Sequence, residues 1–309
     1  MVNSEGIAGH KEQIETLNTL IDAGKLPHAL CFVGEQGLGK RLIAERACDA
    51  LTGGNWHRHP DKWVLVREIN KKTEKLKKEI SVEQIRTLKE ELGRSALGGG
   101  KKLVIIDEAE TLSVAAQNSL LKTLEEPLGD THVFLIVSAE DRLLPTIQSR
   151  CRAMRFFKVD GAEIERLLEG KASKQEATLI ATLACGIPGK AQQLLVENPE
   201  AQLQSAIELL CAPTALKFAR IAELTKQKDP VITARAIAYS RLLLQHILLV
   251  QSGLPSELAD AGYLKELVRN REQPISRTTH ALAILEDIET AINQNCSPAL
   301  ALEHFALAL

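Results

Sequence analysis

The stretch Leu30–Arg41, which reads LCFVGEQGLGKR, decides the fold of this chain of 309 residues. Its apolar beginning is typical of a buried strand, and GEQGLGK then follows the pattern G-x-x-x-x-G-K of a phosphate-binding loop. The glycines leave room for backbone N–H groups to surround phosphates, and Lys40 can reach the β- and γ-phosphates. The loop glycines are Gly34, Gly37 and Gly39. We therefore expect a strand, a loop and a helix that bind the phosphates of ATP or ADP.

One residue departs from the pattern. The loop motif ends in Ser or Thr, whose hydroxyl holds Mg²⁺, but this chain has Arg41 at that position. A helix N-terminus still attracts anions, so the loop keeps its use for phosphate. The sequence predicts a loop that is poorly equipped for Mg²⁺, in a chain whose own ATPase activity is weak or absent. The alternative interpretation is a glycine-rich turn with no ligand.

An acidic pair forms the second motif. In KKLVIIDEAE, an apolar run precedes Asp107 and Glu108, which is typical of a buried strand that ends in two carboxylates. In P-loop ATPases the first such acid holds the Mg²⁺ shell and the second orients the attacking water. Because ligands of parallel sheets bind beyond the carboxyl ends of the strands, we expect the pair and the glycine loop to share one cleft.

The first half of the chain alternates short apolar runs with helical patterns, which predicts a parallel sheet covered by helices. The expected strands are 30–33, 63–66, 103–106 and 133–137, and the expected helices are 40–51, 81–92 and 113–126. The helix that starts at Ser81 opens with a capping box, S-V-E-Q. After about Phe157 the sequence reads almost entirely as helix, including one that Asp229-Pro230 opens and that runs to about Gln251.

Three further residues are candidates for chemistry. Arg150, in Ser-Arg-Cys, is either a solvated surface charge or an arginine finger that reaches the γ-phosphate of a nucleotide on a neighbouring subunit. Ser138, at the end of an expected strand, can touch the γ-phosphate or its water. Lys190 follows Gly186-Ile-Pro-Gly and is either a solvated lysine at a helix start or a residue that faces the cleft.

The composition is that of an ordinary globular protein. Hydrophobic residues make up 45% and aromatic residues 3%, so the core rests on Leu, Ile, Val and Ala. The net charge of −2 argues against a chain that coats nucleic acid by itself. The six cysteines form no C-x-x-C pair, which predicts scattered, buried, reduced thiols. The polar N-terminus is unlike a signal peptide, and we expect a cytoplasmic location.

These motifs resemble the clamp-loader branch of the AAA+ proteins. The resemblance is carried by VIIDEAETLSVAAQNSLLKTLEEP and LLPTIQSRCR, and by LPHALCFVGEQGLGK upstream. Ile7-Ala8-Gly9-His10 resembles the adenine-side box of the family. In addition, His59-Pro60-Asp61, ISVEQIRTL and NCSPALALEHFALAL resemble one bacterial subunit type within that branch. The resemblance covers the whole chain.

The resemblance implies an α/β AAA+ P-loop nucleotide-binding domain with a parallel sheet at 1–158, a three-helix lid at 159–203 and an all-α collar for oligomerisation at 204–309. It also implies a hetero-pentamer with γ/τ-type and δ-type subunits, which uses ATP to place a sliding clamp on primed DNA. Arg150 would be the finger, Ser138 the sensor-1 residue and Lys190 the sensor-2 residue. In such a ring this chain resembles a stator that serves the ATP of a neighbour.

The sequence departs from the family in two ways. Arg41 is one, and the other is the absence of any cysteine between Cys48 and Asp107, where many relatives carry a four-Cys zinc module; we therefore predict no zinc. Two alternatives to the stator stay open. The chain can be an active AAA+ motor subunit of the loader, or, in a third class, a stand-alone DNA helicase or branch-migration motor. The helical half shows no basic recognition helix that would favour the third class.

Overall fold

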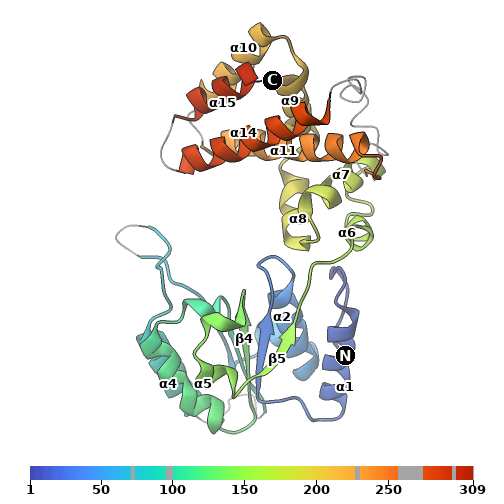
Figure 1. Ribbon diagram of the computed structural model, residues 1–309. Coiled ribbons are helices and arrows are strands. Elements are labelled where there is room, and N and C mark those ends of the chain that lie inside the picture. Colours follow the sequence, from blue (N-terminus) through green and yellow to red (C-terminus); the bar gives the residue numbers. More distant parts are fainter. Residues whose placement is uncertain (71–73, 95–99, 227–229, 257–273, 294–296, 309) are drawn as a thin grey trace. The chain divides into compact units, whose positions relative to one another are not determined.

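The computed structural model describes residues 1–70, 74–94, 100–226, 230–256, 274–293 and 297–308 (Figure 1). The chain divides into two compact units. The first comprises residues 1–163 and 186–189, and the second comprises residues 164–185 and 190–309. The predicted division of the helical part into a lid and a collar at residue 203 stays a prediction.

The first unit is built on a sheet of five parallel strands in the order β2-β3-β4-β1-β5. The strands are β1 (Ala29–Val33), β2 (Lys62–Leu65), β3 (Lys102–Ile106), β4 (Thr131–Val137) and β5 (Arg152–Arg155). Every residue of β1, β3 and β4 is buried, as expected for central strands that are covered on both faces. The parallel sheet predicted from the sequence is confirmed.

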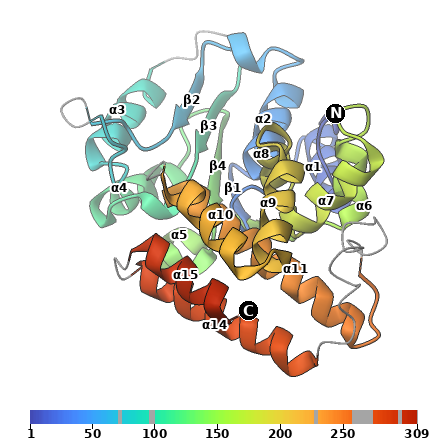
Figure 2. The ribbon, with the colours of Figure 1, turned by 90° about the horizontal axis from the view of Figure 1, so that it is seen from above.

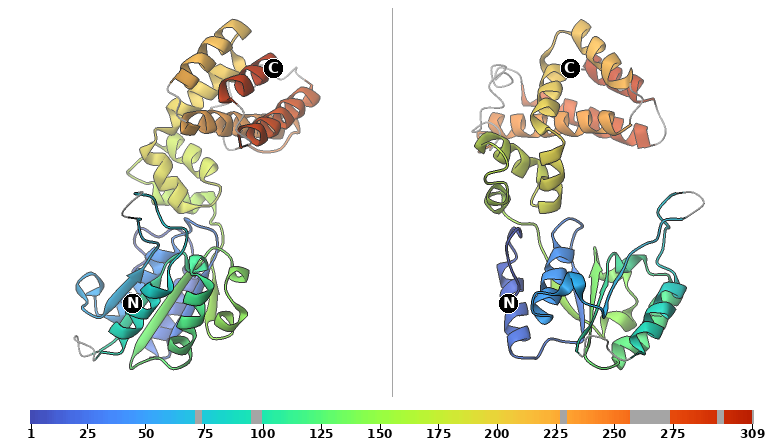
Figure 3. Two further views of the ribbon diagram at one scale, coloured as in Figure 1. Left: turned by 90° about the vertical axis from the view of Figure 1, so that its left-hand side faces the viewer. Right: turned by 180° about the vertical axis from the view of Figure 1, so that it is seen from behind.

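Helices cover both faces of the sheet (Figures 2 and 3). On one face lie α1 (Lys11–Asp22) and α2 (Lys40–Leu51), whose apolar side chains form one core with Phe32 and Phe134 of the sheet. On the other face lie α3 (Val82–Leu92) and α4 (Val114–Glu125), which form a second core with the sheet. The sheet therefore presents its strand ends, rather than its faces, to ligands.

Most of the expected elements are present. The predicted helix 40–51 is α2 with the same bounds, and the capping box at Ser81 is formed, with Ser81 Oγ accepting from Gln84 N. The predicted strand 63–66 begins and ends one residue earlier, as β2. We did not predict β5, a short edge strand in which both terminal arginines are exposed.

Helices are the only regular secondary structure in the described residues of the second unit. Its apolar core joins α9, α10, α11, α14 and α15 through buried residues such as Leu209, Leu285 and Phe305. The helices after β5 are α6 (Gly161–Leu167), α7 (Lys174–Ala184), α8 (Pro188–Val196), α9 (Pro199–Cys211), α10 (Thr214–Lys226), α11 (Pro230–Gln251), α14 (Ile275–Asn293) and α15 (Pro298–Ala308). The predicted helix that ends at Gln251 is α11; its expected cap, Asp229, lies outside the described residues.

The prediction that the cysteines are buried is right for Cys31 and Cys48 but wrong for Cys185 and Cys211, which are exposed. Both exposed cysteines stand where a helix ends, beyond the stripe of side chains that packs into a core. Cys296 lies outside the described residues. None of the helices in the described part of the chain combines the length and apolar character that a membrane span needs.

Candidate nucleotide site

The glycine loop connects β1 to α2 at the carboxyl end of the sheet. Gly34, Gly37 and Gly39 have φ values of 154°, 87° and 89°, which residues that carry a Cβ rarely adopt. A Cβ on Gly34 would also lie 2.5 Å from the Phe156 carbonyl oxygen. These backbone angles explain the glycine spacing: they turn the chain sharply from the strand into a helix that begins at Lys40.

Lys40 is buried and contacts its own loop. Its Nζ donates to the carbonyl oxygen of Gly34 and, at 2.7 Å, to that of Glu35. Burial lowers the pKa of Lys40, and the negative charges of Glu110, Asp107 and Glu35 oppose that shift. The lysine head thus lies in the field of three carboxylates beside the loop, from where it can meet phosphate oxygens.

The predicted adenine-side box lies against this loop. The His10 Nε2 atom is 3.0 Å from the Leu38 carbonyl oxygen, and its ring packs edge-on against Phe156. Ala8 is buried, and the half-buried Ile7 packs on the same core as α1 and α2. The structure therefore places this segment beside the loop, and its role toward adenine stays a prediction.

A distant segment also contacts the loop. Gly189, in the Gly186–Gly189 segment that belongs to the first unit, donates its N–H to the Gly37 carbonyl oxygen at 2.8 Å. A Cβ on Gly189 would meet that oxygen at 2.9 Å, so the close approach requires glycine. Lys190, the predicted sensor-2 residue, follows directly; it is exposed and belongs to the second unit. Its proposed role is not tested by this placement.

Arg41 pairs with two carboxylates. Its Nη1 is 3.1 Å from Asp107 Oδ2, and its Nε is 3.1 Å from Glu45 Oε1 one turn along α2. Partial burial lowers the pKa of Arg41, but the hydrogen bonds and charges of Glu45 and Asp107 outweigh it and leave the pKa raised. The loop and the acidic strand end do come together as predicted, and the residue that joins them is the one that departs from the motif.

The acids after β3 point to different partners. Glu108 has a left-handed backbone, with φ 51°, and its Oε2 accepts from Arg67 Nε at 2.7 Å. Glu110, which we did not predict, accepts with Oε1 from Ser138 N at 3.0 Å and from Ser138 Oγ at 2.5 Å. Glu110 lies in the 3₁₀ turn Ala109–Thr111. The acidic spacing in D-E-A-E is the one signal in the sequence that marks it.

Arg150 lies at the opposite end of the sheet. It precedes β5, and β5 runs parallel to β1 with Arg152 beside Leu30. A rise of about 3.3 Å per residue puts the loop at Gly34 about 13 Å further along the strand direction. Arg150 Nε donates to Glu125 Oε1 at 2.6 Å, and Nη1 donates to the Thr146 carbonyl oxygen at 2.8 Å. The side chain is 34% exposed, so it is reachable from outside.

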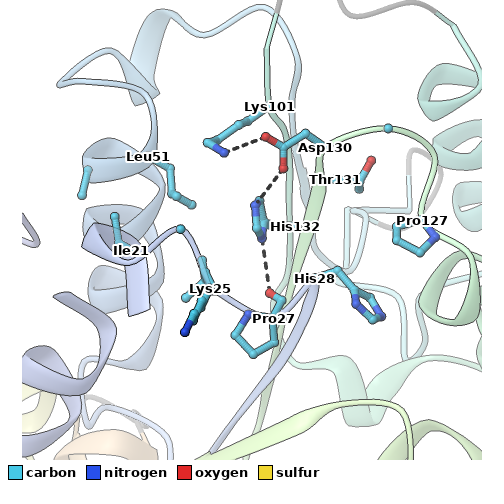
Figure 4. A pocket seen from close by; sticks show the side chains of 14 residues that line it. Ile21, Lys25, Pro27, His28, Leu51, Lys101, Pro127, Asp130, Thr131 and His132 are labelled. Carbon is cyan, nitrogen blue, oxygen red and sulfur yellow. Dashed lines mark hydrogen bonds and ion pairs between the residues drawn. The ribbon is translucent and has the colours of Figure 1, made fainter. Parts of the chain in front are cut away.

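A hollow of about 650 Å³ opens at this same end of the sheet (Figure 4). Asp130 joins Lys101, at 2.6 Å, to His132, at 3.1 Å, and His132 Nδ1 lies 3.2 Å from the Pro27 carbonyl oxygen. Burial lowers the pKa of His132, although the Pro27 hydrogen bond and the Asp130 charge oppose it. Lys101, Asp130 and His132 pair with one another, which fits a structural role for these three residues.

The glycine loop and Lys40 offer hydrogen-bond donors for an anion, but the described residues offer no cluster of metal ligands. Among the residues that the structure describes, no three His, Cys, Asp or Glu side chains gather where they could hold a metal ion. The strand order, the loop between β1 and α2, and the acids after β3 define a P-loop α/β protein of the AAA+ class. The predicted fold class is thereby confirmed.

Comparisons with known proteins narrow this class. The family described as "DNA polymerase III, delta subunit" matches residues 9–160. The DNA polymerase III subunit delta' of Pseudomonas aeruginosa is 34% identical over 59% of this chain and 60% of that protein. The corresponding subunit of Bacillus subtilis is 35% identical over 55% of this chain and 54% of its own length. Among solved structures, the RuvB Holliday junction branch migration motor of Thermotoga maritima is 14% identical, with a TM-score of 0.48, over 85% of this chain and 88% of that one.

Residues 9–160 of the chain therefore resemble the family described as "DNA polymerase III, delta subunit", and the two relatives named above are δ′ subunits. The resemblance to clamp-loader proteins found in the sequence is confirmed. The match spans only 60% and 54% of the length of these two relatives.

Proposed function

We propose that this chain is a δ′-like stator subunit of a bacterial DNA polymerase III clamp loader, acting in DNA replication. In this role it sits in a hetero-oligomer with γ/τ-type and δ-type subunits and helps to load the sliding clamp onto primed DNA. It supplies Arg150 in trans to the ATP of a neighbour, and its own ATPase activity is weak or absent. As an AAA+ protein it binds nucleotide at its own loop.

The position of Arg150 carries this proposal. The finger candidate lies at the amino end of β5, whereas the loop of the same chain lies at the carboxyl end of β1. The distance of about 13 Å along the strands exceeds the reach of an arginine side chain, so Arg150 cannot serve its own loop. The guanidinium of the half-buried Arg150 is held by Glu125 and by the Thr146 carbonyl oxygen, and the ion pair itself contributes only about 0–1 kcal/mol, as surface ion pairs do.

The test is ATP turnover by a reconstituted loader that carries Arg150→Ala in this chain. An arginine finger contributes roughly 10³ to 10⁵ in turnover at the site that it serves, so we expect the share of that one neighbouring site to be lost from the total. Arg150→Lys should fail as well, because an ammonium does not reproduce the planar guanidinium. The matched control is Arg86→Ala, which removes another exposed arginine paired to a glutamate. Normal turnover by an Arg150→Ala ring that assembles normally would refute the proposal.

The second candidate is an active motor subunit, and the retained Lys40, Asp107 and Glu108 favour it. In that role Glu108 would orient the attacking water and Ser138 would sense the γ-phosphate. The motor predicts that Lys40→Ala in this chain abolishes this chain's share of ATP turnover, while the stator predicts no change. Turnover by the loader with Lys40→Ala therefore separates the two candidates.

A further inference from the structure

We propose that the loop of this chain takes a nucleoside di- or triphosphate without a divalent metal ion, with Arg41 in the place of the metal. The inference deepens the proposed function and rests on it only in taking the ligand to be a nucleotide. It follows from the contacts that already occupy the Asp107 carboxylate, and from the backbone N–H groups of the loop that donate to no atom of the described residues.

The AAA+ class implies Mg²⁺, so its fit to these residues can be tested. The loop hydroxyl that would bind the ion is replaced by the Arg41 side chain. Both carboxylate oxygens of Asp107 are already engaged: Oδ2 with Arg41 Nη1 at 3.1 Å, and Oδ1 with the Glu108 N–H at 3.0 Å. A cation here would meet a guanidinium at close range and would find neither of its two protein ligands. The residues present do not fit Mg²⁺.

The phosphate side of the site is intact by contrast. In the described chain, the backbone N–H groups of Gly37, Leu38 and Gly39 donate no hydrogen bond to protein. They precede the N-terminus of α2, so their dipoles and that of the helix favour an anion at the same place. Lys40 adds a positive charge, and its ammonium group donates to two loop carbonyl oxygens. The loop therefore keeps the donors that hold phosphate oxygens.

Arg41 supplies what the metal would supply, namely a fixed positive charge beside the phosphates. The Arg41 side chain is 46% exposed, and its guanidinium has five N–H donors, of which the structure uses Nε for Glu45 and one of Nη1 for Asp107. The remaining N–H groups are suited to phosphate oxygens, because the guanidinium fork matches their geometry. Glu45 and Asp107 hold this side chain from both sides and fix its position.

The experiment measures the binding of ADP and ATP to the full-length chain by calorimetry, once in Mg²⁺ and once in EDTA. We expect the unaltered chain to bind both nucleotides at least as tightly in EDTA as in Mg²⁺, because Mg²⁺ in solution converts free nucleotide into a metal complex that this site does not fit. For Arg41→Thr, which restores the hydroxyl and frees Asp107, we expect binding in Mg²⁺ to be tighter than in EDTA by about tenfold or more. Arg86→Thr, the same exchange at an exposed position of α3, should behave like the unaltered chain.

A second readout follows the metal itself. The magnetic resonance signal of Mn²⁺ with ADP should be unchanged when the unaltered chain is added and should fall further when Arg41→Thr is added. Metal-dependent binding by the unaltered chain, or metal-independent binding by Arg41→Thr, would overturn the inference. So would a lack of nucleotide binding in both buffers, which would leave the role of Arg150 standing because that role concerns the nucleotide of a neighbour.

Discussion

Arg67 Nε donates to Glu108 Oε2 at 2.7 Å, and this pair decides the direction of the second acid of the site. Arg67 follows β2 and Glu108 follows β3, and these strands are neighbours in the sheet. The left-handed backbone of Glu108 is uncommon for a residue with a side chain, and the ion pair helps to hold it. Glu108 is thus paired with Arg67, whereas activation of a water molecule would require the Glu108 carboxylate to turn toward the phosphate loop.

Two changes together should therefore be needed to create turnover in the isolated chain. Arg67→Ala alone frees Glu108 but leaves Arg41 on Asp107, so we expect phosphate release to stay at background. Arg41→Thr with Arg67→Ala opens the metal position and frees the acid, so we expect slow, Mg²⁺-dependent turnover. A phosphate-release assay measures both. Adding Glu108→Gln to the double variant is the control, and it should return the rate to background; a rate that survives this change would show that Glu108 is not the group responsible.

The Ser138 hydroxyl should contribute to stability through Glu110. Ser138→Ala removes the 2.5 Å hydrogen bond to Glu110 Oε1 and leaves only the Ser138 N–H on that oxygen. Since hydrogen bonds to charged groups contribute about 1.5–3 kcal/mol, we expect the free energy of unfolding to fall by about 1–2 kcal/mol for this half-buried pair. Urea denaturation measures the change. Ser149→Ala, at an exposed serine, should stay within about 0.5 kcal/mol of the unaltered chain.

Glu110 should also weaken nucleotide binding. Its carboxylate contributes to the negative field at Lys40, where a phosphate group would have to sit. Glu110→Gln keeps the shape of the side chain and removes the charge, so we expect ADP to bind about fivefold more tightly, which corresponds to roughly 1 kcal/mol. Calorimetry with ADP tests this value. Glu12→Gln, at an exposed glutamate of α1, is the matched control, and an equal gain in both variants would count against a local effect.

The sequence predicted all three strands whose residues are completely buried, and it predicted the bounds of α2. The runs that became β1, β3 and β4 are continuous apolar stretches, and the bounds of α2 follow from the loop before it and from Thr52-Gly53-Gly54 after it. The edge strand β5, RAMR, was missed because both arginines are exposed and carry no apolar pattern. Its strand character comes from pairing with β1, which no local pattern records.

The site was predictable in its motifs but not in its pairings. The departure at Arg41 is visible in the sequence, whereas its partner Asp107 lies 66 positions away. Arg67 and Glu108 are 41 positions apart and meet only because β2 and β3 are adjacent. The same holds for Glu110 and Ser138, which follow the adjacent strands β3 and β4. These pairs can be predicted only when the order of the strands in the sheet is known.

His132 should make stability depend on pH. Burial lowers its pKa below the ordinary value of 6.5, so the folded chain keeps it neutral while the unfolded chain protonates it. Stability is therefore full above about pH 6.5 and is lost as the pH falls through the folded pKa, by about 1.4 kcal/mol for each tenfold difference in proton affinity between the unfolded and folded chains. His132→Gln should flatten the dependence of the urea midpoint on pH between about 8 and 5.5. His57→Gln, at an exposed histidine, should keep the slope; equal slopes for all three proteins would contradict the prediction.

Gly189 should be essential to the order of the phosphate loop. Its N–H donates to the Gly37 carbonyl oxygen, and a Cβ there would meet that oxygen at 2.9 Å and the Gly37 Cα at 3.0 Å. Gly189→Ala must push the segment off the loop, because the opposing atoms are backbone. The lost hydrogen bond and contacts should lower the free energy of unfolding by about 1–2 kcal/mol and weaken ADP binding. Gly93→Ala is the control: its Cβ would come no closer than 3.3 Å, to the Glu90 carbonyl oxygen, so the exchange should cost less than Gly189→Ala and should leave ADP binding unchanged. If Gly189→Ala matches Gly93→Ala in both urea denaturation and ADP titration, the segment does not support the loop.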